Sequence, residues 1–355
     1  MPTRRTHVVL LLTLLAATVG ASCSSTPAKT GLQVVDLGIE GESSAATAIS
    51  PNTRFVAGTT VAEIDGADVS SIFVHDRTRG TTQIIAPLAG RYARPEGVTD
   101  DGDVVGMSSV KPGTDAPVAP VASIDGKLVR LPGSETKPFG AALSINQAGV
   151  IVGWIGDADE NATEPASWER GELTRLGSFG GTFGQALDVN DVGDVVGWSQ
   201  LAGDPFRSSG FVTKGQLSSN GALPGLGGDT VFFRSLNSSG IAVGDASTVD
   251  GLTEAVSWTA DSGTATITKP FGDGTYVLAS GIDDRGQIVG SAPVDDAGED
   301  LRAWTRLADG TVSLLDDLTK DSTWTVRYAN DISEGVIAAE AERDGAIRAV
   351  VVLPK

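Results

Sequence analysis

The sequence predicts an all-β fold built from repeated units. Three observations support this prediction: a strand–turn–strand pattern recurs seven times along the 355 residues, glycine is abundant at 45 residues, and no helical periodicity of useful length follows the N-terminal segment. A repeat of about 47 residues is typical of propellers and solenoids rather than of a chain divided into ordinary domains.

Each copy of the repeat begins with a strand that ends on an apolar anchor residue. The turn that follows contains Asn or Asp and then Gly, because an Asx side chain bonds its own backbone and Gly accepts a positive φ. A valine-rich second strand then ends in Gly, and residues 144–154 and 188–198 are the clearest copies. The seven anchors, spaced 44 to 50 residues apart, are Ile49, Val98, Ile145, Val189, Leu236, Ile282 and Ile332.

Two further strands complete each unit, as at residues 166–168 and 173–176. Seven units of four short strands match a seven-bladed β-propeller, which we assign to residues 32–355. The last unit stops at Lys355 after three strands, whereas the chain begins with an unpaired strand, Leu32–Gly38. We therefore expect the N-terminal strand to complete the last blade and close the ring. An open array of β modules is the competing architecture.

Residues 1–22 have the features of an export signal peptide. Arg4 and Arg5 precede an apolar stretch at 8–19, and small residues follow it. The stretch is too short for a permanent transmembrane helix, which needs roughly 20 residues. Nothing in these residues separates general secretory export from the twin-arginine route.

The single cysteine, Cys23, directly follows Ala21 and Ser22, and this segment resembles the bacterial lipobox. The resemblance implies that the Cys23 thiol receives a diacylglycerol, that acyl chains such as palmitate hold the mature protein on the outward face of the cell membrane, and that residues 23–31 are a flexible tether. The alternative is cleavage after Ala21, which would give a secreted protein with a free thiol.

The composition excludes several classes of function. A net charge of −19 disfavours nucleic-acid binding, which needs Lys and Arg to neutralise phosphates. With one Cys and two His, the chain offers no zinc site and little imidazole chemistry. His75, the only His outside the signal peptide, lies at a repeat position and is expected to be structural. We expect no cofactor, and we expect a monomer that contacts the membrane only through its lipid anchor.

The acidic turns superficially resemble calcium loops. Residues 100–103 and 188–194 are rich in carboxylates, which calcium prefers. The same turn at residues 146–149 and 237–240 carries no surplus acid, so a turn that forms without carboxylates has no need of a metal. We therefore assign no metal site.

The run 176–182, together with Ala186, residues 189–190 and residues 193–197, resembles the bacterial extracellular repeats called the HAF family. A second partial match occurs at 226–229, and Pro165–Trp168 stands where the family has its His-Ala-Phe tripeptide. The resemblance implies a β-propeller-like fold and an extracellular location. It carries no catalytic residues with it.

Positions at which the repeats disagree are the best candidates for a ligand site. One row before the anchors is mostly small, as close packing near a propeller axis requires; its members are Ala46, Pro95, Ala142, Ala186, Phe233, Ala279 and Ala329. The neighbouring rows depart from the pattern, and if the innermost strands line a central channel these side chains converge there. The candidate ligand-binding residues are Arg94, Glu96, Gln185, Arg234, Tyr328 and Asn330. The alternative is that they are scattered along a solvated channel without a ligand.

These observations favour an exported, lipid-anchored propeller that acts as a binding or scaffold module at the cell envelope. Its partner would be an extracellular protein or glycan, and cations within an acidic shell favour an anionic or hydroxylated ligand. The competing function is a carbohydrate-active hydrolase or lyase with two carboxylates in the channel, for which Glu96, Asp188 and Asp331 are the available acids. Trp324 belongs to no repeat row and is a candidate contact residue.

Overall fold

A computed structural model describes residues 31–355 except 114–116, 135–138, 158–161, 219–220, 270, 272–273, 296 and 320–321. Residues Gly31–Lys355 form one compact unit. The predicted signal peptide, Cys23 and the tether up to residue 30 lie outside the described residues.

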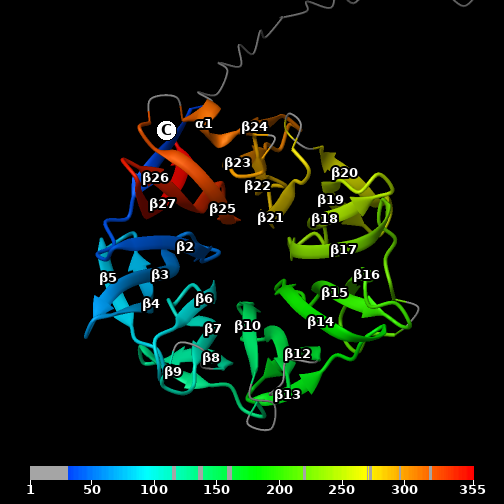
Figure 1. The fold of residues 1–355 in the computed structure, drawn as a ribbon, viewed down its shortest axis with the longest axis horizontal. Coiled ribbons are helices and arrows are strands. Elements are labelled where there is room, and N and C mark those ends of the chain that lie inside the picture. The colour runs from blue at the N-terminus through cyan, green and yellow to red at the C-terminus, as the bar shows by residue number, and fades with distance from the viewer. Residues whose placement is uncertain are drawn as a thin grey trace, which may run out of the picture. The chain divides into compact units, whose positions relative to one another are not determined.

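The compact unit is a ring of seven antiparallel sheets around a central channel (Figure 1). Six sheets contain four strands, and the fourth sheet contains three within the described residues. The prediction of a seven-bladed β-propeller is therefore confirmed. The described residues include one helix, the single-turn α1 (Leu315–Leu318), and no helix that is long and apolar enough to cross a membrane.

The strands follow the chain around the ring, and the first strand of each blade is the innermost. Blade 1 contains β2 (Ser43–Ile49), β3 (Phe55–Ile64), β4 (Ala67–Asp76) and β5 (Thr81–Ile85). Blade 2 contains β6 (Ala93–Val98), β7 (Val104–Ser109), β8 (Val118–Ile124) and β9 (Lys127–Arg130). Blade 3 contains β10 (Phe139–Ile145), β11 (Ile151–Gly156), β12 (Thr163–Glu169) and β13 (Glu172–Arg175). Blade 4 contains β14 (Gly180–Val189), β15 (Val195–Leu201) and β16 (Ser208–Thr213).

The remaining blades complete the circle. Blade 5 contains β17 (Gly227–Leu236), β18 (Ala242–Thr248), β19 (Thr253–Thr259) and β20 (Gly263–Thr268). Blade 6 contains β21 (Leu278–Ile282), β22 (Ile288–Pro293), β23 (Leu301–Arg306) and β24 (Val312–Leu314). Blade 7 contains β25 (Thr325–Ser333), β26 (Val336–Arg343), β27 (Ala346–Pro354) and the N-terminal strand β1 (Leu32–Asp36).

The N-terminal strand closes the ring, as the sequence predicts. β1 pairs antiparallel with β27, from Leu32 opposite Pro354 to Asp36 opposite Val350. The Lys355 amide also donates to the Gly31 carbonyl at 3.0 Å. Both ends of the compact unit are therefore held in one sheet, which leaves the ring without a free blade at either end.

In blades 3 to 6 the residue after the anchor is Asn or Asp, and its side chain fixes the turn; the other three blades have Ser50, Thr99 and Ser333 there. In blade 3, the Asn146 side-chain oxygen accepts hydrogen bonds from the amides of Ala148 and Val150 at 3.1 and 2.9 Å, and Gly149 adopts a φ of 79°. The same arrangement recurs at Asn190 and Asn237. This is the turn chemistry that the repeat predicts.

The same asparagines also join neighbouring blades. The Nδ2 groups of Asn146, Asn190 and Asn237 donate to the backbone carbonyls of Asn190, Asn237 and Asp283, at 3.0, 3.1 and 3.3 Å. Asp283 has no such donor, and its second carboxylate oxygen instead accepts from the Gly335 amide of blade 7 at 3.0 Å. In blades 3 to 6, one side chain thus fixes both a turn and a blade junction.

The small row of the innermost strands lies against a glycine of the second strand. The prediction that this glycine ends the strand is wrong, because β15, for example, continues from Gly197 to Leu201. Ala186, for example, pairs with Gly197, and a Cβ at Gly197 would lie 2.0 Å from the Gln185 carbonyl oxygen. The large exception, Phe233, fits because its ring lies over Gly210 of the preceding blade. Close backbone approach is the reason for glycine at these positions.

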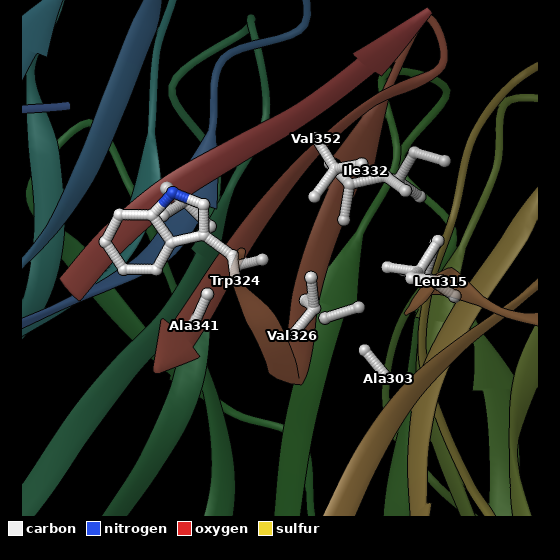
Figure 2. Close-up of a cluster of buried hydrophobic side chains, with 12 residues drawn as sticks. Ala303, Leu315, Trp324, Val326, Ile332, Ala341 and Val352 are labelled. Atoms are coloured by element: carbon white, nitrogen blue, oxygen red, sulfur yellow. The ribbon is translucent and has the colours of Figure 1, made fainter. Parts of the chain in front are cut away.

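The hydrophobic core lies between the blades. Figure 2 shows the junction of blades 6 and 7, where Ala303 and Leu315 face Val326, with Ile332 and Val352 nearby.

The expectation that Trp324 is a contact residue is wrong. This side chain is only 9% exposed and belongs to the core cluster between blades 6 and 7 (Figure 2), and the Arg343 guanidinium covers its ring at 4.0 Å. It lies outside the repeat rows because it packs at the start of β25, where blade 7 meets α1.

We expect Asn146→Asp to destabilise the propeller by about 1–3 kcal/mol at pH 7, the cost of leaving a buried polar group unsatisfied. The carboxylate keeps the acceptor for the turn but faces the Asn190 carbonyl with no proton to donate. Urea unfolding would measure the loss, which should shrink at pH 4 because a protonated carboxyl can donate again.

The matched control is Gln33→Glu, an amide-to-acid change at an exposed position of β1. It should change stability by less than about 0.5 kcal/mol. Equal losses for the two variants would contradict a special role of the Asn146 donor.

Candidate functional site

Every innermost strand carries a bulge directly after its small residue. The pairing register shifts there in all seven blades, for instance between Ala46 and Ala48 in β2 and between Phe233 and Ser235 in β17. A bulge bends the strand and redirects one side chain. The bulged residues are Thr47, Glu96, Leu143, Leu187, Arg234, Ser280 and Asn330.

All seven bulged residues line a cavity of about 420 Å³ in the central channel. The cavity extends past the anchors to the turns that follow them, so the C-terminal halves of the innermost strands form its walls. These residues vary between blades, whereas the packing row is mostly small. The bulge is therefore a position at which the blades can differ from one another without disrupting the core.

The structure brings four of the six predicted ligand residues to the cavity wall: Arg94, Glu96, Arg234 and Asn330. Gln185 and Tyr328 are not part of the wall. Both stand before the small residue, where they pair across the blade with Trp198 and Glu340. Arg94 occupies the same row but reaches the cavity, where it pairs with Glu96.

Four wall residues were missed, namely the bulged Thr47, Leu143, Leu187 and Ser280. The signal that identifies them is the repeat alignment itself, because each directly follows a residue of the small row. These four residues are small or aliphatic, whereas the sequence prediction rests on charged, amide and aromatic departures from the pattern.

Glu96 is held by Arg94 across a distance of 3.0 Å between Nε and Oε1. Burial in the channel wall raises the pKa of Glu96 to about 6, and the Arg94 charge opposes that rise. The Glu96 side chain is only 17% exposed, whereas that of Arg94 is 44% exposed. The guanidinium therefore has open surface beside a carboxyl that titrates near neutral pH.

Arg234 forms the equivalent pair on the other side of the channel. Its Nε donates to the Asp245 carboxylate of β18 at 2.5 Å, and its guanidinium lies 5.9 Å from the Phe232 ring. Burial raises the pKa of Asp245, and Arg234 opposes this shift. Within the described residues, the terminal nitrogens of Arg234 make no protein hydrogen bond.

Two polar wall residues are already used to join blades. Asn330 donates from Nδ2 to the Ala46 carbonyl at 2.8 Å, which links blade 7 to blade 1. Thr47 donates from its hydroxyl to the Pro95 carbonyl at 2.8 Å, which links blade 1 to blade 2. Both residues therefore contribute to closure of the ring, and the charged pairs are the better candidates for ligand contacts.

Asp188 and Asp331, which the hydrolase hypothesis requires, also join blades. Asp188 accepts hydrogen bonds from the Ser144 hydroxyl at 2.7 Å, the Ser235 hydroxyl at 3.0 Å and the Leu236 amide at 2.9 Å. Asp331 accepts from the Ile49 amide of blade 1 at 2.9 Å and from the Ile332 amide at 2.7 Å. These contacts favour structural roles over acid–base chemistry.

Both carboxyls titrate unusually. Burial raises the pKa of Asp188, while its hydrogen bonds oppose the shift. Burial raises the pKa of Asp331 to about 7, and the nearby charge of Asp188 adds to that effect.

The acidic turns also serve contacts between blades. Carboxylates of Asp100, Asp191 and Asp284 accept from the backbone amides of Asn52, Gln147 and Ser238 in the preceding blades, at 2.8 to 2.9 Å. Among the described residues, no group of three or more His, Cys, Asp or Glu side chains is placed to hold a metal ion. His75 pairs with the Thr82 hydroxyl at 2.9 Å on the outer part of blade 1, away from the cavity.

No protein-family model matches the chain, and no curated protein does. Solved structures do match. The β-propeller domain of the Trilobed protease from Pyrococcus furiosus aligns with a TM-score of 0.59 at 10% identity, over 88% of this chain and 94% of that one. Prolyl endopeptidases align with a TM-score of 0.53 at 13% identity, over 88% of this chain and 47% of theirs.

These similarities show the propeller fold alone, because the identities are low. This chain spans about half the length of the prolyl endopeptidases that it matches. The Trilobed protease propeller is described as having an open velcro topology, whereas here β1 pairs with β27 and closes the last blade.

We expect the propeller to lose stability between pH 4 and pH 7 through Asp331. The folded-state pKa of about 7 lies above the ordinary 3.8, so the folded state holds the proton more tightly and ionisation favours unfolding. Asp331→Asn removes this titration. Relative to the unmodified protein, the variant should become more stable as pH rises across that window, as measured by urea midpoints.

Asp68→Asn is the control, since Asp68 is exposed on β4. Its stability curve should run parallel to that of the unmodified protein. If the Asp331→Asn curve also ran parallel, the Asp331 carboxyl would titrate as it does in solvent.

Proposed function

We propose that this protein is an exported, lipid-anchored β-propeller that acts as a binding module at the cell envelope, with its ligand site in the central channel. One observation carries the proposal. The seven bulged residues occupy equivalent positions, yet they differ in charge, polarity and size around one cavity of about 420 Å³. That volume falls within the range of small-molecule sites.

The charged pairs support binding in the channel rather than a purely structural lumen. Arg94–Glu96 and Arg234–Asp245 place open guanidinium surface against the cavity, with side-chain exposures of 44% and 38% for the arginines. Here each pair combines a sheltered carboxylate with an accessible cation.

Export and anchoring rest on the N-terminal sequence. The basic, apolar and small segments of residues 1–22 and the lipobox-like position of Cys23 support a lipoprotein, and the HAF-like repeat supports an extracellular location. We further propose that the protein is monomeric.

The binding proposal is tested by thermal unfolding of the purified full-length protein with a panel of neutral sugars, sugar acids, amino acids, dipeptides and nucleotides. A compound present at ten times its Kd stabilises the folded state by about 1.4 kcal/mol. We expect at least one class to raise the Tm of the unmodified protein and to have no effect on Ser280→Trp, whose indole would fill the cavity.

The control for the indole is Ser262→Trp, an exposed position in the β19–β20 turn. It should respond to ligands as the unmodified protein does. The channel site is overturned if no compound changes the Tm of the unmodified protein, or if compounds raise the Tm of Ser280→Trp as much as that of the unmodified protein.

Anchoring predicts that labelled palmitate is incorporated into the protein in bacterial cells and that Cys23→Ser abolishes the incorporation. The variant should also move from the membrane fraction to the soluble envelope fraction or the medium. Labelled protein that persists in Cys23→Ser would refute lipidation at this residue.

A further inference from the structure

The channel wall carries charged and apolar side chains in a defined order along blades 2 to 5. Glu96, Leu143, Leu187 and Arg234 are the bulged residues of four consecutive blades, and their innermost strands β6, β10, β14 and β17 contact one another in turn (Figure 1). Two leucines therefore form an apolar centre, with the Arg94–Glu96 pair on one side and the Arg234 guanidinium on the other.

The flanking pairs are neutral as units. Arg94 is neutralised by Glu96, and Arg234 by Asp245. Glu96 lines the cavity beside Arg94, so an anionic ligand that approached this guanidinium would also meet a carboxylate. Like-charge contact in a sheltered site disfavours such ligands.

An ion pair at a cavity wall offers donors and acceptors side by side. A ligand hydroxyl both donates and accepts, so vicinal hydroxyls can bond a guanidinium and its carboxylate together. The two leucines offer a surface for the apolar C–H face of a ring. A saccharide combines these two features in a single molecule.

We propose that the channel binds a neutral saccharide, with a ring face against Leu143 and Leu187 and hydroxyls on the Arg94–Glu96 pair and the Arg234 guanidinium. This inference rests on the proposed function and narrows it to one ligand class. Of the ligand types that the sequence suggests, the structure thus favours the hydroxylated one over the anionic one.

The experiment is calorimetric titration of the full-length protein with glucose, galactose, mannose, N-acetylglucosamine and disaccharides of these sugars. We expect at least one neutral sugar to bind. Glu96→Gln and Arg234→Met should each weaken binding by about tenfold or more, because each removes a charge-assisted hydrogen bond.

Glu164→Gln and Arg175→Met are the matched controls. These residues form an Arg–Glu pair at 3.4 Å on β12 and β13, with side-chain exposures of 28% and 51%, outside the cavity wall. Neither should change sugar affinity. Urea midpoints of all four variants establish that the weakened binders are folded.

The outcomes separate the two proposals. The saccharide inference is overturned if sugars bind equally well to Glu96→Gln and Arg234→Met. It is also overturned if only sugar acids, amino acids or nucleotides bind and Ser280→Trp abolishes their binding, but in that case the channel site stands. If no compound binds in the channel, both proposals fall.

Discussion

In blades 3 to 6 the propeller depends on one hydrogen-bonded side chain per blade, the Asx residue after the anchor. Its oxygen fixes the turn between the first two strands, and where it is Asn its amide nitrogen reaches the next blade, as in the run from Asn146 through Asn190 to Asn237. Local and long-range structure are therefore specified by the same atoms. Flat blades pack through nonspecific apolar contacts, but these polar links set the relative position of neighbours, since a buried donor without its acceptor is costly. This is why the repeat tolerates changes in loop length and sequence elsewhere.

Much of the fold follows from the sequence because its signals are periodic. The anchors and the Asx–Gly turns of blades 3 to 6 recur, and the unpaired first strand indicates closure; these predictions are confirmed, whereas the glycines predicted to end the second strands lie within them. The channel wall is harder to predict, because it depends on a bulge. A bulge shifts the alternation of side chains by one position. The sequence alone therefore does not show which of the two rows beside the small residue faces the channel. That is why Gln185 and Tyr328 were grouped with Glu96 and Arg234, and why Leu143 and Leu187 were passed over. The contacts that occupy Asn330 with Ala46 and Asp188 with Leu236 join residues of different blades, so no local pattern reveals them.

The bulge also explains how a repetitive ring can carry a specific site. At the small row and the anchors, the seven blades need nearly the same residue, because neighbouring sheets approach closely there. The bulged residue is released from that packing and directed into the lumen, where its identity has little effect on the core. Function can therefore be concentrated in the bulged residues that do not link blades, on rigid strands that hold side chains more accurately than loops do. The carboxylates that look catalytic in the sequence, Asp188 and Asp331, lie one residue further on, where packing between blades resumes.

Closure by β1 affects how the protein folds into the complete ring. Its partner strand lies at the opposite end of the chain, with Leu32 opposite Pro354, so six blades can form before the seventh acquires its outer strand. Contacts between residues so distant in sequence form slowly. Until then the outer edge of β27 is an unpaired strand edge, able to accept β1 from its own chain or from a second molecule. Ring closure within one chain thus competes with strand exchange between copies. Exchange depends on protein concentration and closure does not, so dilution during folding favours closure within the chain.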